Sequence, residues 1–198
     1  LALGLDMLVD VVLNPSFPGE AFERQREVQL AARKAQDDRL LTAAFRTMRE
    51  TLYGQSGYGL DGLGTESSVK SLSADVITTF HRQLAVPNNA VLAIYGDIKP
   101  ESIRSEIEKA FGLWGQGVGF EKPVTPSQGG GMQRVSSERD KEQAVVIVGY
   151  RGCTFYDEDR FALELISEAC SDLGSRLFMR IREELGLAYY VGAQCQPG

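Results

Sequence analysis

The sequence has a single histidine and only three cysteines among 198 residues, and both shortages exclude kinds of site. Cys153, Cys170 and Cys195 are widely spaced, odd in number and form no Cys-x-x-Cys pair. This pattern favours buried, reduced thiols over a disulfide framework and disfavours zinc ligation by cysteine. His81 lies between Phe80 and Arg82 in an amphipathic pattern, which is typical of a surface or helix-packing residue. A site with two histidine ligands is impossible in this chain.

An excess of positive charge and a long apolar run are also missing. The formal net charge is −6, and the basic residues are scattered among acidic ones, so we expect no nucleic-acid partner. No apolar run reaches membrane-spanning length, and we expect no signal sequence in these residues. We expect a soluble protein without a membrane span, and the compartment stays open between cytoplasm and periplasm. The chain begins inside a helical pattern without an initiator methionine, which predicts a piece of something longer.

Helical periodicity is what the sequence does contain. Ser73 and Asp157 are suited to cap helix starts, and Pro100 is suited to a first helical turn. Residues 1–13 are apolar nearly all round, which predicts a buried helix. The predicted helices cover residues 1–13, 20–35, 40–52, 65–71, 73–84, 100–111 and 157–170.

Three further stretches have the patterns of strands. Residues 90–95 and 143–150 are rich in β-branched and apolar residues, and residues 187–193 alternate between two faces. The sequence therefore predicts an α/β (α+β) fold in which helices are layered on a β-sheet.

Between residues 112 and 136 the sequence changes character, with glycines, two prolines and no periodicity. We interpret residues 113–136 as a linker between domains at 1–112 and 137–198, and a long surface loop within one domain is the alternative. Either half alone leaves a sheet incompletely covered. We therefore hypothesise that segments 90–95 and 143–150 join in one sheet, as a circularly permuted unit, or that two copies exchange halves.

The stretch from Gly174 to Gly192 carries the most information about function. It predicts a short helix that starts at Ser175, ends at Gly186 and has one apolar stripe, made of Leu177, Phe178, Ile181 and Leu185. Arg182 lies on the edge of that stripe. From the spacing alone, Arg182 could be an arginine whose stem covers the core while its head reaches water.

Residues 175–193 resemble the late segment of the insulinase/pitrilysin-like zinc metallopeptidases, which include the mitochondrial processing peptidase and the core subunits of the cytochrome bc1 complex. In that family an arginine of this helix and a tyrosine seven residues later hold the substrate backbone opposite the zinc site. The matching residues are Arg182 and Tyr189. A guanidinium and a phenol can hydrogen-bond peptide carbonyls without reading side chains. The resemblance therefore implies that Arg182 and Tyr189 bind substrate, and we expect no catalytic residue here.

The resemblance extends over most of the chain. Residues 17–28, 88–97 and 138–150 are similar, in order, to three further patches of the family. The family is built from repeated α/β units, so residues 1–112 would be the C-terminal part of one peptidase-like unit. Residues 137–198 would then be the N-terminal part of the next unit.

The zinc ligands of the family are missing. They are an inverted His-x-x-Glu-His helix and a distant glutamate, whose position aligns near Ala31 and Ala32. We therefore expect no metal in this chain, with the zinc in the parent protein or in a partner subunit. The expected function is a portion of a zinc-dependent metalloendopeptidase that contributes substrate-backbone binding and is inactive by itself.

The expected partners are a peptide or unfolded polypeptide and a zinc-bearing half or subunit of the same family, and a homodimer formed by exchange is a further possibility. Two alternatives are a non-catalytic scaffold homologue of the same fold and a generic α/β interaction module.

Overall fold

The structure of the chain is a computed structural model that describes residues 2–121 and 131–196. The chain divides into two compact units, Leu1–Ile147 and Val148–Gly198. The middle of the predicted linker, residues 122–130, lies outside the described residues.

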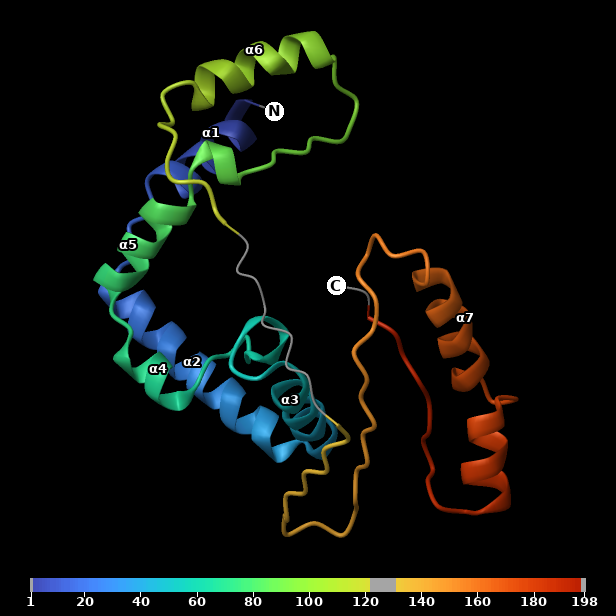
Figure 1. Ribbon diagram of the computed structural model, residues 1–198. Helices are drawn as coiled ribbons and strands as arrows, with labels where there is room; N and C mark the ends of the chain where they lie inside the picture. The colour runs from blue at the N-terminus through green and yellow to red at the C-terminus, as the bar shows by residue number, and fades with distance from the viewer. Residues whose placement is uncertain (1, 122–130, 197–198) are drawn as a thin grey trace. The chain divides into compact units, whose positions relative to one another are not determined.

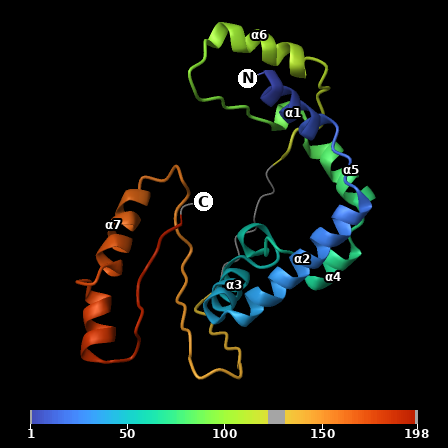
Figure 2. The ribbon, with the colours of Figure 1, turned by 180° about the vertical axis from the view of Figure 1, so that it is seen from behind.

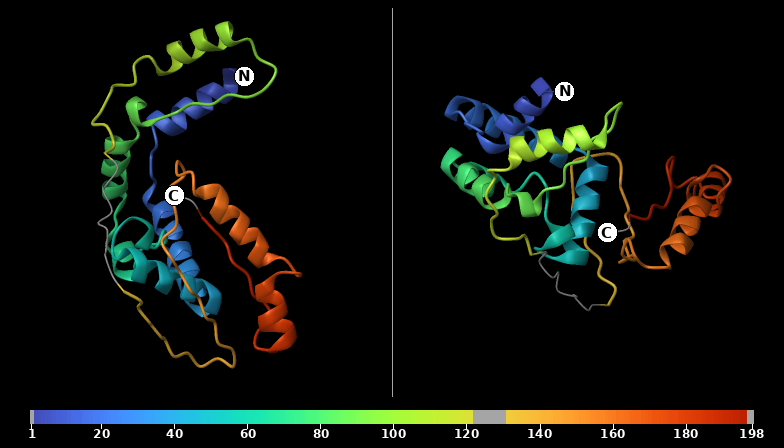
Figure 3. Two further views of the ribbon diagram at one scale, coloured as in Figure 1. Left: turned by 45° about the vertical axis from the view of Figure 1, so that its right-hand side comes forward. Right: turned by 90° about the horizontal axis from the view of Figure 1, so that it is seen from above.

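The first unit is built from helices (Figure 1). Its α-helices are α1 (Ala2–Leu13), α2 (Gly19–Asp38), α3 (Leu40–Tyr53), α4 (Glu66–Ser71), α5 (Ala74–Leu84) and α6 (Pro100–Phe111), and its 3₁₀ turns are η1 (Gly57–Gly59) and η2 (Pro87–Asn89). Helix α2 contacts α3 and α4, and α3 contacts η1. Helices α2 and α4 lie side by side from the front and from behind (Figures 1 and 2), and α1 lies beside α6 (Figure 3).

Capping residues account for several of the helix ends. The Thr65 hydroxyl accepts a hydrogen bond from the Ser68 backbone N–H at 3.0 Å, and the Ser68 hydroxyl accepts one from the Thr65 N–H, which makes a capping box at α4. The Ser73 hydroxyl accepts from the Val76 N–H at 3.3 Å at α5. Pro100 occupies the first turn of α6. These three starts agree with the starts predicted from the sequence.

Side chains of α2 fix the backbone on both sides of α4, before the helix begins and after it ends. Arg26, Gln29 and Arg33 lie on one face of the helix, and their nitrogens donate to the backbone carbonyls of Leu72, Leu63 and Gly64 respectively. The Gln29 bond measures 3.0 Å from Nε2 to the Leu63 oxygen. Helix α2 therefore holds both of these segments through its side chains.

Two asparagines of η2 hold the segment after α6 in the same way. The Asn88 side-chain amide donates to the Gly117 carbonyl and accepts from the Gly117 N–H, both at 3.0 Å. The Asn89 side-chain oxygen accepts from the Phe120 N–H at 2.7 Å. The Trp114 indole N–H donates to the Ala85 carbonyl at 3.1 Å.

The second unit contains helix α7 (Arg160–Ser171), the π-helical η3 (Phe178–Glu184) and an extended segment that returns along α7 (Figures 1 and 3). Two serines one turn apart on α7 fix this segment. Ser167 Oγ donates to the Ala193 carbonyl at 3.0 Å, and Ser171 Oγ both donates to that carbonyl and accepts from the Ala193 N–H.

The apolar core is small. Among the described residues, the buried apolar side chains are Val69, Val86 and Ile103. Helix α1, which the sequence predicts to be buried, instead has Leu3, with a relative exposure of 73%, on its exposed side. That prediction was wrong because, among the described helices, α1 packs mainly against α6, and its other side stays exposed.

The α/β (α+β) fold class predicted from the sequence is wrong. No β-strand is present in residues 2–121 or 131–196. Segments 90–95, 143–150 and 187–193 are not helical, but they form no ladder of backbone hydrogen bonds, and Val91 is 97% exposed. The apolar pattern indicates an extended backbone, but a sheet also needs a neighbouring strand. The permuted sheet that would join 90–95 with 143–150 within one chain is therefore absent from the described residues as well.

Two smaller findings complete the fold. Asp157 does not cap α7, because the helix begins at Arg160, and the Asp157 carboxylate accepts from the Thr154 N–H at 3.0 Å instead. Within the described residues, no helix has both the length and the apolar character needed to cross a membrane.

Gly117 is expected to be required by its close approach to Val86. A Cβ atom at position 117 would lie 2.6 Å from Val86 Cγ1, and Val86 is a stiff, buried side chain. Gly117→Ala should therefore lower the free energy of unfolding by about 1–3 kcal/mol, measured by urea denaturation. Gly115→Ala is the matched control because its Cβ would meet no atom within 4 Å. Equal stabilities of the two variants would contradict this account.

Candidate functional site

The helix that carries Arg182 begins at a buried serine. Ser175 has a relative exposure of 5%, and its hydroxyl accepts a hydrogen bond from the Phe178 N–H at 3.1 Å. This is the N-cap expected from the sequence. The bond fixes the backbone of Phe178 at the point where η3 begins.

The helix itself differs from the prediction, because residues Phe178–Glu184 are π-helical rather than α-helical. The Leu185 N–H donates to the Arg180 carbonyl five residues back, and the Leu187 N–H donates to the Ile181 carbonyl six residues back. The wider turn rotates later side chains away from the positions that α-helical spacing predicts. Leu185, placed on the apolar stripe from sequence, is 48% exposed.

Gly186 ends the helix as predicted, with φ +61° in the left-handed region. The chain turns there, so the residues that follow run back past the helix. Because Ser167 and Ser171 hold Ala193, the returning segment is fixed at its far end to α7. Tyr189 lies between these two fixed points.

The structure brings together the two residues singled out from the sequence. The Arg182 guanidinium carbon lies over the Tyr189 ring, 4.4 Å from its centroid. The same carbon lies over the Phe178 ring at 4.7 Å, and Arg182 Nε lies 3.5 Å from Glu183 Oε1. The Arg182 side chain is 32% exposed and Tyr189 is 84% exposed. Both polar groups are therefore accessible, and the guanidinium is held by two cation–π contacts.

Sequence reasoning missed two parts of this arrangement. Phe178 was assigned to the apolar stripe only, although its position four residues before Arg182 is the spacing of a side-chain pair on one helix face. The two serines, Ser167 and Ser171, were not considered, although hydroxyls one turn apart on a helix can bond a neighbouring backbone.

The described residues do not fit the zinc site of the resembled family. They contain no group of three histidine, cysteine, aspartate or glutamate side chains able to hold a metal ion. His81 instead packs edge-to-face on Phe17, with ring centroids 5.7 Å apart. Ala31 and Ala32, the residues to which the resemblance assigns the distant glutamate, lie on α2 and supply only methyl groups.

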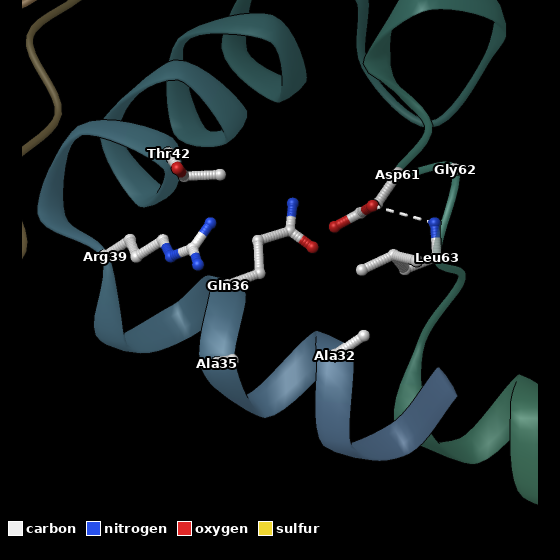
Figure 4. A pocket seen from close by; sticks show the side chains of 8 residues that line it. All are labelled: Ala32, Ala35, Gln36, Arg39, Thr42, Asp61, Gly62 and Leu63. Carbon is white, nitrogen blue, oxygen red and sulfur yellow. Dashed lines mark hydrogen bonds between the residues drawn. The ribbon is translucent and has the colours of Figure 1, made fainter. Parts of the chain in front are cut away.

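A pocket of about 440 Å³ lies beside Ala32 in the first unit (Figure 4). Small side chains on α2 face the loop at Gly62, and this leaves the space open. The Gln36 and Asp61 side chains point toward one another in the pocket, and Asp61 accepts from the Leu63 N–H at 2.9 Å. The pocket is lined by Ala32, Ala35, Gln36, Arg39, Thr42, Asp61, Gly62 and Leu63, which include one carboxylate and no histidine.

Asp61, which lines the pocket, also belongs to a network of charged side chains. Arg33 Nη1 lies 3.4 Å and Arg46 Nη1 3.7 Å from Asp61 Oδ2, and Arg46 Nη1 lies 2.5 Å from Asp37 Oδ1. Burial opposes the charge on Arg46, but the hydrogen bond and charge of Asp37, with the charges of Glu50 and Asp61, raise its pKa overall. The network ties α2 and α3 to the loop.

Comparison with known proteins identifies similar sequences. Residues 71–197 match the family described as the peptidase M16 inactive domain. Over 195 residues the chain is 30% identical to an uncharacterized zinc protease of Mycobacterium leprae, covering 96% of this chain and 44% of that protein. Over 204 residues it is 24% identical to the probable inactive metalloprotease YmfF of Bacillus subtilis, covering 99% and 48%. The chain thus spans less than half the length of these relatives.

A solved structure has the same fold. The peptidase M16 inactive domain from Pseudomonas fluorescens matches with a TM-score of 0.76 at 20% identity, covering 98% of this chain and 47% of that one.

Asp61 is expected to be important for stability because it is the shared partner of two arginines. Asp61→Asn keeps an acceptor for the Leu63 N–H but removes the charge that faces Arg33 and Arg46. Since the Asp61 side chain is only 10% exposed, the variant should lose about 1–3 kcal/mol of unfolding free energy in urea titrations. Glu164→Gln, which removes an acid 53% exposed and paired with Arg160, should remain close to the parent protein. If the urea midpoint of unfolding were the same for Asp61→Asn and the parent protein, the charged network would not contribute to stability.

Proposed function

We propose, from the premise that this chain belongs to the peptidase M16 family as a domain of its inactive type, that it binds the backbone of a peptide through Arg182 and Tyr189. The observation that carries this proposal is the contact at 4.4 Å between the Arg182 guanidinium and the exposed Tyr189 ring. The pair offers N–H and O–H donors at one place, and the carbonyls of an extended peptide are the acceptors that such donors bind.

The chemistry of cleavage belongs elsewhere in this proposal. The two relatives named above are an uncharacterized zinc protease and a probable inactive metalloprotease, and each is about twice as long as this chain. Zinc would be held by another part of the parent protein or by a partner subunit of the same family. The chain contributes binding, and it orients the peptide without touching the metal.

A second candidate is a scaffold that keeps the fold and acts on no peptide. It is favoured by the name of YmfF, the relative that is 24% identical over 204 residues. The two candidates differ in an assay on the complete protein with its partner, because a scaffold neither binds nor processes an unstructured peptide.

Substitution of the two residues should weaken peptide binding without altering the fold. Arg182→Ala removes a charged donor, so the Kd for a fluorescein-labelled unstructured peptide should rise about 10- to 100-fold in fluorescence anisotropy. Tyr189→Phe keeps the ring and removes only the hydroxyl, so a rise of about 3- to 10-fold is expected.

Arg180→Ala is the matched control for these variants. Arg180 lies in the same helix, but its guanidinium is paired with Glu184 and its side chain is 66% exposed. The control should bind peptide like the parent chain. If Arg180→Ala and Arg182→Ala weaken binding equally, the effect is one of net charge and the proposal is wrong.

The chain by itself is expected to hydrolyse no peptide when zinc is supplied. Its described residues lack a three-ligand set, and its single histidine packs against Phe17. The measurement is a fluorogenic peptide assay combined with metal analysis of the dialysed protein. Stoichiometric zinc that accompanies peptide hydrolysis would contradict the separation of binding from chemistry.

A further inference from the structure

Phe178 contacts the proposed binding residue without being able to hydrogen-bond a peptide itself. Its ring centroid lies 4.7 Å from the Arg182 guanidinium carbon, and its backbone N–H is bonded to the buried Ser175 hydroxyl. The Phe178 ring is thus attached to a fixed point of the helix, and it is less exposed than the Tyr189 ring. Of the two rings that contact Arg182, Phe178 is the better anchored.

A second arginine of the same unit provides an internal comparison. The Arg160 guanidinium carbon lies over the Phe155 ring at 4.8 Å and over the Phe161 ring at 4.5 Å. Arg160 Nη1 donates to the Phe155 carbonyl at 3.1 Å, so this arginine is used inside the protein. Each of the two arginines therefore contacts two aromatic rings, but they differ in the acceptors that their N–H groups bond.

Among the described residues, the terminal nitrogens of Arg182 make no hydrogen bond like that of Arg160 Nη1. In the part of the chain that the structure describes, the polar contact of its guanidinium is that of Nε with Glu183 at 3.5 Å. The ring contacts occupy apolar surface of the guanidinium and leave its N–H groups to donate in the guanidinium plane. Arg182 is thus stacked on two rings while its terminal donors stay available to a ligand.

We infer that Phe178 is a positioning residue, which holds the Arg182 guanidinium so that its terminal N–H groups meet the carbonyl oxygens of an extended peptide. This inference rests on the proposed function. An arginine side chain has a large rotamer entropy, and restricting it before binding reduces the entropy lost when the peptide binds. Phe178 therefore contributes to peptide affinity only through Arg182.

The test is a double-mutant cycle in the full chain, with a fluorescein-labelled unstructured peptide as the probe. Phe178→Leu should raise Kd about 3- to 10-fold when Arg182 is present and leave Kd unchanged in the Arg182→Ala background. Phe178→Tyr and Phe178→Trp keep an aromatic ring and should restore affinity. Phe161→Leu, which removes the corresponding ring from Arg160, should bind like the parent chain.

A second readout does not depend on peptide binding. In ¹⁵N-correlated NMR spectra of the full chain, the Arg182 Nε–Hε resonance, assigned by its loss in Arg182→Ala, should shift in Phe178→Leu because a ring current is removed. The same resonance should stay near its original position in Phe161→Leu. Circular dichroism establishes that each variant keeps the helical content of the parent chain.

The outcomes separate the inference from the proposed function. If Arg182→Ala leaves Kd unchanged, the proposed function fails, and the positioning role in peptide binding fails with it. If Arg182→Ala weakens binding but Phe178→Leu does not, the proposed function stands and the inference is wrong. An equal effect of Phe178→Leu with and without Arg182, or an unmoved Nε–Hε resonance, also overturns the inference, because Phe178 would then act on the fold alone.

Discussion

Hydrogen bonds from helix side chains to the backbone of neighbouring segments are the interaction on which the structure depends. A sheet would satisfy the backbone of extended segments through a ladder, but the described residues contain no strand. Gln29 instead bonds the Leu63 carbonyl, Asn88 bonds both backbone groups of Gly117, and Ser167 bonds the Ala193 carbonyl. Each bond comes from a helix or a 3₁₀ turn and fixes a segment at one or two points. The position of each of these segments is therefore fixed by a few polar side chains.

The arrangement of Arg182 and Tyr189 follows from this constraint. Gly186 turns the chain, and the serines of α7 hold it again at Ala193. Between these points Tyr189 reaches the guanidinium of Arg182. The wider turn of η3 matters as well, because it changes which side chains share a face of the helix. The contact thus depends on backbone geometry at both ends, and the residue types alone do not determine it.

The sequence predicted helix ends better than it predicted packing, for a local reason. Thr65, Ser73 and Gly186 act within one turn of the chain, so the pattern around each residue contains the whole signal. The π-helix was missed because side chains four residues apart are neighbours in an α-helix as well as in a π-helix. The pattern of a seven-residue segment therefore cannot show which of the two helix types forms. The sheet was wrongly predicted because an apolar run indicates only that a segment favours an extended backbone and burial. The run carries no information about whether another strand lies beside it.

The same contrast applies to the candidate site. Arg182 and Tyr189 were found through a resemblance of residues 175–193, and their contact could not be read from spacing, since it requires a turn at Gly186 and a fixed point at Ala193. The pocket beside Ala32 was not predicted, because it results from the absence of large side chains on one face of α2. Small side chains on a helix indicate a pocket only when the position of the segment that faces them is known.

The contacts that join Arg182 to Tyr189 and the side chains that line the pocket on α2 belong to different parts of the chain. Every contact that forms the Arg182 and Tyr189 pair lies within residues 167–193, in one compact unit. The position that the resemblance assigns to a metal-ligating glutamate lies on α2 in the other unit, where Ala32 lines a pocket and Asp61 of that pocket is paired with Arg33. None of the contacts of Arg182 and Tyr189 described above involves a side chain of α2. The guanidinium and the phenol are therefore held in position by contacts within their own unit.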